Sequence, residues 1–221
     1  SIDNMLTFGA YSGITTKPAY SSRRVNLKAT NLNLEGQKAI SLLSSGNYDI
    51  YNSYFFMVNF AEAAVQNEFR GIEIKQDSNS SHAPNYNFTN CVIQNPVIFS
   101  QSNNSKWNDI NLELELAGNA TVKFNNLQNW GRDASNTEPL IKYNKLSGTN
   151  TTVTFENVNF ITEFSNPLIS LSGSAIQSGE IVFKYSRFPA SANILQDNKI
   201  LYIHCTTYSS NNSNSKLHTA G

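Results

Sequence analysis

The chain has 221 residues, and its 16 Lys and Arg residues balance 16 Asp and Glu residues, which gives a formal net charge of +0 at pH 7. This length is sufficient for one domain with a sizeable core. A neutral chain lacks the excess positive charge that draws proteins to phosphate backbones. The composition therefore argues against nucleic-acid partners, and with only 14% charged residues the polar surface is expected to be largely uncharged.

No apolar run approaches the ~20 residues that cross a bilayer as a helix, so membrane insertion is not expected. The histidines, His82, His204 and His218, lack the spacing of metal ligands. We therefore expect neither a metal nor a cofactor. The chain starts at Ser1 without a methionine and shows no signal peptide, which suggests a fragment or a processed product.

Residues 1–24 have no sustained periodicity and are interpreted as a lead-in that continues from a longer chain. From residue 25 an eight-residue frame recurs, in the order apolar, any, apolar, any, Asn-like, any, any, apolar. Its copies occupy residues 25–32, 48–55, 86–93, 122–129, 153–160, 181–188 and 201–208. The predicted domain spans residues 25–208, and residues 209–221 form a polar tail with little to bury.

Each copy of the frame predicts a strand, a bend and a second strand. The alternation at its start buries every second side chain. Its fifth position favours Asn, which enters the left-handed backbone region more readily than most non-glycine residues. In chain order this position holds Ala29, Asn52, Asn90, Asn126, Asn157, Tyr185 and Cys205. We expect Asn126 and Asn157 to occupy stacked bends of adjacent coils.

Apolar runs led by Pro96, Pro139 and Pro167 follow three of the copies. Proline is tolerated at the first residue of a strand, so each copy supplies a third short strand. Three strands joined by one tight bend and two loops of variable length describe one coil of a parallel β-helix. The sequence therefore predicts an all-β fold of about six to seven stacked coils.

The coil arrangement also predicts how the core aromatic residues and the cysteines are placed. The third frame position predicts an inward stack that contains Phe88, Phe124, Phe155 and Phe183. Cys91 and Cys205 fall in copies that are not neighbours, so two free thiols are expected.

The segments between the copies are less regular. Residues 53–71 leave open whether a short helix interrupts the strands. Residues 107–117 alternate cleanly and predict an extra strand inside a long loop, and residues 128–138 are expected to form another loop.

The frame followed by a proline-led strand resembles the right-handed parallel β-helix of the pectate-lyase-like superfamily, whose tight turn carries an Asn ladder. The resemblance covers residues 25–208 and is weakest where Ala29, Tyr185 and Cys205 replace Asn. It implies that ligands lie along the outer face of the proline-led sheet and on the loops leading into it.

Residues next to the inward isoleucines of that sheet are expected to face outward. They are Ser41, Glu73, Phe99, Lys142 and Ser170. Because neighbouring coils are ~4.8 Å apart, Glu73, Phe99 and Lys142 would form a strip as long as one or two sugar rings, overhung by Trp130 and Arg132. A solvated ladder explains the same residues, and both interpretations stay open.

Two pairs of acids are candidates for catalysis. Glu113 and Glu115 lie two residues apart on one strand face, ~6.8 Å by strand geometry. This distance is within the range of about 5 to 9.5 Å that separates the two catalytic carboxyl groups of glycoside hydrolases. Glu73 with Asp77 is the second pair. Simple amphipathic patterning also places acids on the solvent face, so the sequence leaves enzyme activity undecided, with a polysaccharide hydrolase or lyase as the candidate.

Within the superfamily, the chain looks most like the β-helical part of a bacteriophage tailspike. The resemblance implies a virion receptor-binding fibre that is extracellular, assembles as a homotrimer and binds bacterial surface polysaccharide. A secreted polysaccharide lyase or glycoside hydrolase of the same fold is the first alternative, and the passenger domain of a bacterial surface adhesin is the second.

Overall fold

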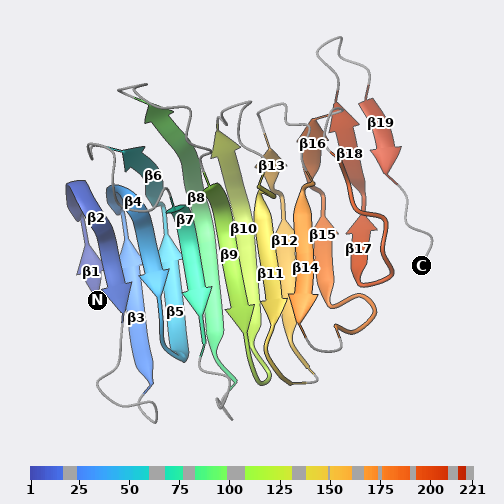
Figure 1. Cartoon of the computed structure of the whole chain (residues 1–221), viewed down its shortest axis with the longest axis horizontal. Coiled ribbons are helices and arrows are strands. Elements are labelled where there is room, and N and C mark those ends of the chain that lie inside the picture. Colours follow the sequence, from blue (N-terminus) through green and yellow to red (C-terminus); the bar gives the residue numbers. More distant parts are fainter. Residues whose placement is uncertain are drawn as a thin grey trace.

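A computed structural model of the chain describes residues 1–16, 24–59, 68–76, 83–98, 108–130, 138–148, 150–160, 167–173, 176–189, 193–208 and 214–217. The described residues form strands and turns without helices. Successive coils stack from the N-terminal to the C-terminal end of the molecule (Figure 1). The fold is an all-β, right-handed parallel β-helix, as predicted.

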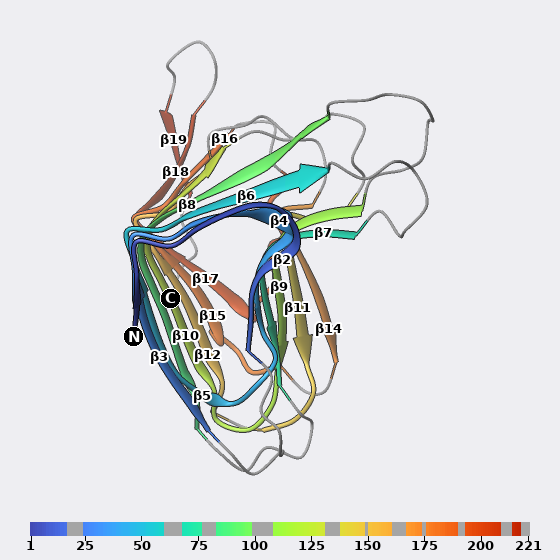
Figure 2. The same cartoon turned by 90° about the vertical axis from the view of Figure 1, so that its left-hand side faces the viewer.

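Three sheets enclose the core when the molecule is viewed along its axis (Figure 2). The first contains β1 (Ile2–Asp3), β3 (Val25–Thr30), β5 (Gly46–Tyr51), the starts of β8 (Asn85–Ile98) and β10 (Thr121–Trp130), β12 (Thr152–Glu156), β15 (Ile181–Lys184) and β17 (Ile200–Ile203). The second contains the starts of β2 (Leu6–Thr16) and β4 (Asn33–Leu42), β6 (Tyr54–Asn59), the ends of β8 and β10, β13 (Asn159–Phe160), β16 (Arg187–Pro189) and β18 (Cys205–Tyr208).

The third sheet carries the candidate site. It contains the ends of β2 and β4, then β7 (Glu68–Lys75), β9 (Asn108–Leu116), β11 (Ile141–Lys145) and β14 (Ile169–Gly173). Pairing within the three sheets is parallel, whereas β19 (Asn214–Leu217) runs antiparallel to β18. This last strand covers the edge that β18 would otherwise present to other chains.

The bend between the first and second sheets is built from residues in the left-handed backbone region. Asn52, Asn90, Asn126 and Asn157 have φ of 50°, 56°, 56° and 54°. The Asn126 Nδ2 donates to Asn90 Oδ1 at 2.9 Å, and the Asn90 Nδ2 donates to Asn52 Oδ1 at 3.2 Å. The predicted left-handed bends of Asn126 and Asn157 on adjacent coils are confirmed, and the side chains of three successive rungs form an amide ladder.

Replacing Asn90 by Ala should lower the free energy of unfolding by about 1 to 3 kcal/mol. The variant loses two ladder hydrogen bonds, each worth ~1 kcal/mol, and places a residue with a Cβ but no polar side chain in the left-handed region. Urea unfolding measures the change, and the control is Asn85→Ala, which loses one side-chain hydrogen bond, from Asn85 Nδ2 to Asn47 Oδ1 at 3.2 Å, at a position without a left-handed bend. Equal unfolding midpoints for Asn90→Ala and the wild-type protein would contradict the ladder's contribution.

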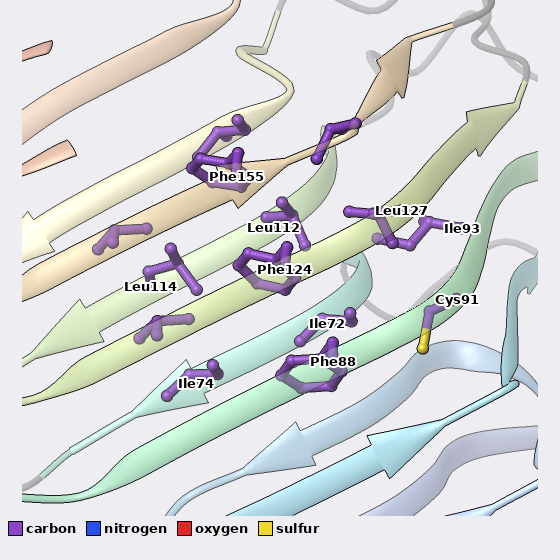
Figure 3. Close-up of a cluster of buried hydrophobic side chains, with 14 of the residues drawn as sticks. Ile72, Ile74, Phe88, Cys91, Ile93, Leu112, Leu114, Phe124, Leu127 and Phe155 are labelled. Carbon is purple, nitrogen blue, oxygen red and sulfur yellow. The ribbon is translucent and has the colours of Figure 1, made fainter. Parts of the chain in front are cut away.

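The core contains the predicted aromatic stack. Phe88, Phe124, Phe155 and Phe183 are fully buried, and successive ring centroids lie 5.2, 5.1 and 4.5 Å apart with nearly parallel planes. Figure 3 shows three of these rings in a row opposite the isoleucines and leucines of the third sheet. Cys91 and Cys205 are buried free thiols, as expected.

The register corrects the frame at both ends of the helix. Leu27 pairs with Tyr48, and Asn31, with φ of 54°, occupies the bend, so the first frame starts two residues later than predicted. Ile200 pairs with Ile181, and His204 occupies the bend with φ of 52°, so the last frame starts one residue earlier. The stretch from Ile200 to Ile203 is apolar at nearly every position, and therefore its alternation does not define a register.

Two further segments differ from the prediction. Residues 108–116, expected as an extra strand, are the regular third-sheet strand of their coil, because Leu112 pairs with Ile72 and Ile141. Ile98, expected in that sheet, instead ends β8 and pairs with Asn59 of the second sheet. In the stretch left open as a helix, Phe56 lies in strand β6.

The lead-in and the tail also contain strands. β1 pairs with β3 and β2 with β4, so the helix begins before residue 25 and has one more first-sheet rung than predicted. Asn4, with φ of 54°, supplies the bend of this extra coil. Residues 214–217 of the predicted tail form β19. Within the described ranges, no helix is long and apolar enough to span a membrane.

Candidate functional site: a charged row on the third sheet

One row of side chains crosses the outer face of the third sheet. Residues Ile72 and Ile74 of β7, and Leu112 and Leu114 of β9, are buried and face the core (Figure 3). Side chains alternate along a strand, so the residues between these pairs point outward. Paired rung by rung, the row consists of Ser41, Glu73, Glu113, Lys142 and Ser170.

Glu73 is the most heavily bonded residue of the row. It is 2% exposed; its Oε2 accepts a hydrogen bond from Ser41 Oγ at 2.7 Å, and Lys38 Nζ and Lys75 Nζ each lie 3.0 Å from its Oε1. Burial acts to raise the pKa of this carboxyl group, but the hydrogen bonds from Ser41, Lys38 and Lys75 together outweigh burial and hold the pKa below its ordinary value. The carboxylate therefore stays ionised at neutral pH.

Glu113 lies on the next rung and shares one cation with Glu73. Its Oε2 accepts from the guanidinium of Arg70, which is also buried, and lies 3.7 Å from Lys75 Nζ. Its Oε1 lies 3.8 Å from Lys142 Nζ. The Lys75 and Lys142 side chains are 34% and 43% exposed, whereas Glu113 is 4% exposed. The cluster thus turns ammonium groups toward solvent and keeps its two carboxylates beneath them.

Removing the Glu73 carboxylate should flatten the pH dependence of stability in acid. A carboxyl group whose pKa is lower in the folded state stabilises the fold above its unfolded-state pKa of 4.5, and this contribution is lost as the pH falls through the folded-state pKa. Melting temperatures measured from pH 6 to pH 2.5 should therefore fall less steeply for Glu73→Gln than for the wild-type protein. Glu115→Gln is the control, and parallel curves for Glu73→Gln and the wild-type protein would refute the account.

The geometry suits binding better than proton transfer. A general acid for glycoside cleavage needs a raised pKa, and Glu73 has a lowered one. Glu113 is occupied by Arg70 and two lysines. Glu115, the expected partner of Glu113, is partly exposed and lies on the next outward row. Its register partners on the neighbouring strands are Lys75 and Asn144. The arrangement offers fixed charges and hydrogen-bond donors along a flat sheet.

The remaining predicted site residues are Phe99, Asp77, Arg132 and Trp130. Phe99, Asp77 and Arg132 lie outside the described residues. Glu113 of β9, rather than Phe99, occupies the rung between Glu73 and Lys142. The backbone of Trp130 ends β10 and pairs with Gln94 in the second sheet.

Three cations of the cluster, Lys38, Arg70 and Lys75, were not among the predicted site residues. Lys75 could have been predicted from the sequence, because it follows Glu73 by two residues and therefore lies on the same face of the strand. Arg70 does not follow the alternation, because Gly71 and Ile72 intervene at the corner of the coil. A Cβ on Gly71 would lie 2.6 Å from Ile93 Cγ2 in the core, so this inward position has no room for a side chain.

Among the residues that the structure describes, no group of three or more His, Cys, Asp or Glu side chains is arranged to hold a metal ion. Comparisons with family models, curated proteins and solved structures found no match to this chain.

Proposed function

We propose that this β-helix is the ligand-binding part of an extracellular, virion-attached spike, and that it holds bacterial surface polysaccharide along the outer face of the third sheet. The observation that carries the proposal is the charged row itself. Lys75 and Lys142 are partly exposed; Lys75 Nζ lies 3.0 Å from the buried carboxylate of Glu73, and Lys142 Nζ lies 3.8 Å from that of Glu113. Donors that are already ordered cost less conformational entropy when they bind a ligand.

The spacing of the row suits an extended polymer. Parallel strands repeat every ~4.8 Å, so Lys142 and Ser170, the partly exposed members of the row, lie one strand spacing apart, while Ser41, Glu73 and Glu113 are buried. The next outward row adds Lys75, Glu115, Asn144 and Ser172. A chain of sugars laid along the axis would meet hydroxyl, amide, ammonium and carboxylate groups in turn, which match the hydrogen-bonding groups of a glycan.

A polysaccharide hydrolase or lyase is the second candidate, and one observation favours it. The carboxylates of Glu73 and Glu113 lie on neighbouring strands and share the ammonium group of Lys75. Paired carboxylates are the usual catalytic groups of glycoside hydrolases. The lowered pKa of Glu73 favours the binding function.

The spike proposal includes assembly as a homotrimer, which rests on the resemblance of the sequence to bacteriophage tailspikes. Its measurement is the mass of the protein in solution by light scattering, for which the proposal expects three chains.

The binding experiment uses purified protein and surface polysaccharides from a panel of bacteria, with retention and release of reducing ends measured together. We expect retention on at least one polysaccharide without new reducing ends, and about tenfold weaker retention for Lys142→Ala, equivalent to ~1.4 kcal/mol. Lys123→Ala is the matched control, because Lys123 is an exposed lysine of the first sheet that also pairs with a glutamate, Glu156, at 3.3 Å.

Three outcomes would count against the proposal. Release of reducing ends by the wild-type protein that stops in the Glu73→Gln variant would favour the enzyme. Equal losses of retention in Lys142→Ala and Lys123→Ala would show that the binding site is not on the third sheet. No retention on any polysaccharide would overturn glycan binding altogether.

A further inference from the structure

A second charged cluster lies inside the helix, at the corner where the third sheet turns into the first. Lys145 ends β11, and Glu180 immediately precedes β15. Both side chains are 0% exposed, and Lys145 Nζ lies 2.5 Å from Glu180 Oε2. A buried pair of opposite charges is costly, because each ion loses its hydration on entering the core.

Two further donors hold the carboxyl group of Glu180. The hydroxyl of Tyr143, also fully buried, donates to Oε1, and the backbone N–H of Gln177 donates to Oε2 at 2.8 Å. Burial, together with the neighbouring Glu180, raises the pKa of Tyr143, so that its hydroxyl keeps the proton it donates. An amine is thereby held 2.5 Å from one oxygen of a carboxyl group whose two oxygens each accept a further hydrogen bond.

We propose that Lys145 and Glu180 condense into an intramolecular amide bond. One proton first passes from the Lys145 ammonium group to the Glu180 carboxylate. The neutral amine nitrogen then attacks the Glu180 carboxyl carbon, a C–N bond forms, and one carboxyl C–O bond breaks. The ammonium group contributes two protons to the departing oxygen, which leaves as water, and the third hydrogen remains on the amide nitrogen. The balance is ammonium plus carboxylate giving amide plus water, and no oxidant, reductant or other reactant is required.

The fold supplies both the driving force and the rate. Condensation removes two buried charges and leaves a neutral amide, so it relieves the desolvation cost that the ion pair carries. Effective molarities for well-placed groups reach about 10⁵ to 10⁸ M, which accelerates a reaction that is slow between free amines and acids in water. The hydrogen bonds from Tyr143 and the Gln177 N–H stabilise the negative charge that develops on the carboxyl oxygens.

The bond would lock the helix at one corner. It would join the third-sheet strand of one coil to the start of the first-sheet strand two rungs further along, across 35 residues of sequence. This cross-link does not depend on a ligand, so its test is independent of the test of the proposed function.

The test is the intact mass of the folded wild-type protein. We expect a mass lower than that calculated from the sequence by one water, increasing in extent when folded protein is incubated. A tryptic digest should contain one branched peptide that joins the segments around Lys145 and Glu180, with no cleavage after Lys145. Lys123→Arg, at an exposed lysine of the first sheet, should keep the mass loss, whereas Lys145→Arg should abolish it.

Two more variants make the result specific. Tyr143→Phe keeps the ring but removes the donor to Oε1, and it should slow the loss of water at least tenfold while the far-ultraviolet circular dichroism stays unchanged. Glu180→Gln should lose ammonia in place of water. Folded wild-type protein that retains its full calculated mass after incubation, with ordinary cleavage after Lys145, would overturn the proposal, even if the Lys145→Arg variant failed to fold.

Discussion

Phe155→Ala is expected to lower the free energy of unfolding by about 3 to 5 kcal/mol, the cost of truncating a fully buried phenylalanine. Its ring stacks on Phe124 and Phe183, with centroids 5.1 and 4.5 Å away. Truncation opens a cavity in the middle of the stack, and the strands on either side cannot close it because their spacing is set by backbone hydrogen bonds.

The matched control is the neighbouring Thr154→Ala, whose side chain faces outward and is only partly buried. Such a surface change should stay within about 0.5 kcal/mol. Urea titration followed by circular dichroism gives both values. If the two variants lost similar stability, Phe155 would not occupy the interior, and the register of the first sheet would be wrong.

Glu113→Ala is expected to cost about 3 to 5 kcal/mol, because it removes a buried carboxylate that accepts a hydrogen bond from the buried guanidinium of Arg70. The removal of a carboxylate from a buried pair costs far more than the removal of one from a surface pair. The same substitution also removes the carboxylate beside Lys142, whereas Lys75 keeps its ion pair with Glu73, so glycan retention should fall together with stability.

Glu115→Ala is the control, since Glu115 lies two residues away on the same face and is more exposed. Its loss should be within about 1 kcal/mol. Similar chemical-denaturation midpoints for the two variants would show that the Arg70–Glu113 pair does not stabilise the third sheet.

The central coils could be predicted from the sequence because two signals coincide there. Alternation fixes which residues face the core, and Asn at a left-handed bend fixes where the strand ends. Phe88, Phe124 and Phe155 each lie at an inward position of the alternation, two residues before an Asn that occupies a left-handed bend. At the ends of the helix the second signal weakens, since Ala29 and Cys205 fit the alternation and the true bend residues are Asn31 and His204.

The candidate site was less predictable, because loop length hides which strands become neighbours. The proline-led run at Pro96 fits the pattern of a third-sheet strand, yet β8 continues through it in the second sheet, and β9 supplies the rung instead. Glu113 therefore meets Glu73 across 40 residues of sequence, a pairing that spacing alone does not specify.

The interior cluster shows a signal that sequence analysis could have used. Ile141, Tyr143 and Lys145 alternate along β11, so the alternation that buries the first two also buries the lysine. Glu180 lies just before the apolar start of β15. A charge at an inward position predicts a buried partner, but only the register between coils identifies Glu180 as that partner.

Lysine labelling with and without polysaccharide tests the central claim most directly. Folded protein is treated briefly with an amine-acetylating reagent, and the modification of each lysine is measured by peptide mass spectrometry. If the polysaccharide lies along the third sheet, it should slow the acetylation of Lys75 and Lys142 several-fold and leave Lys28 and Lys123 of the first sheet unchanged. Protection of Lys28 and Lys123 with unchanged labelling of Lys75 and Lys142 would contradict the claim.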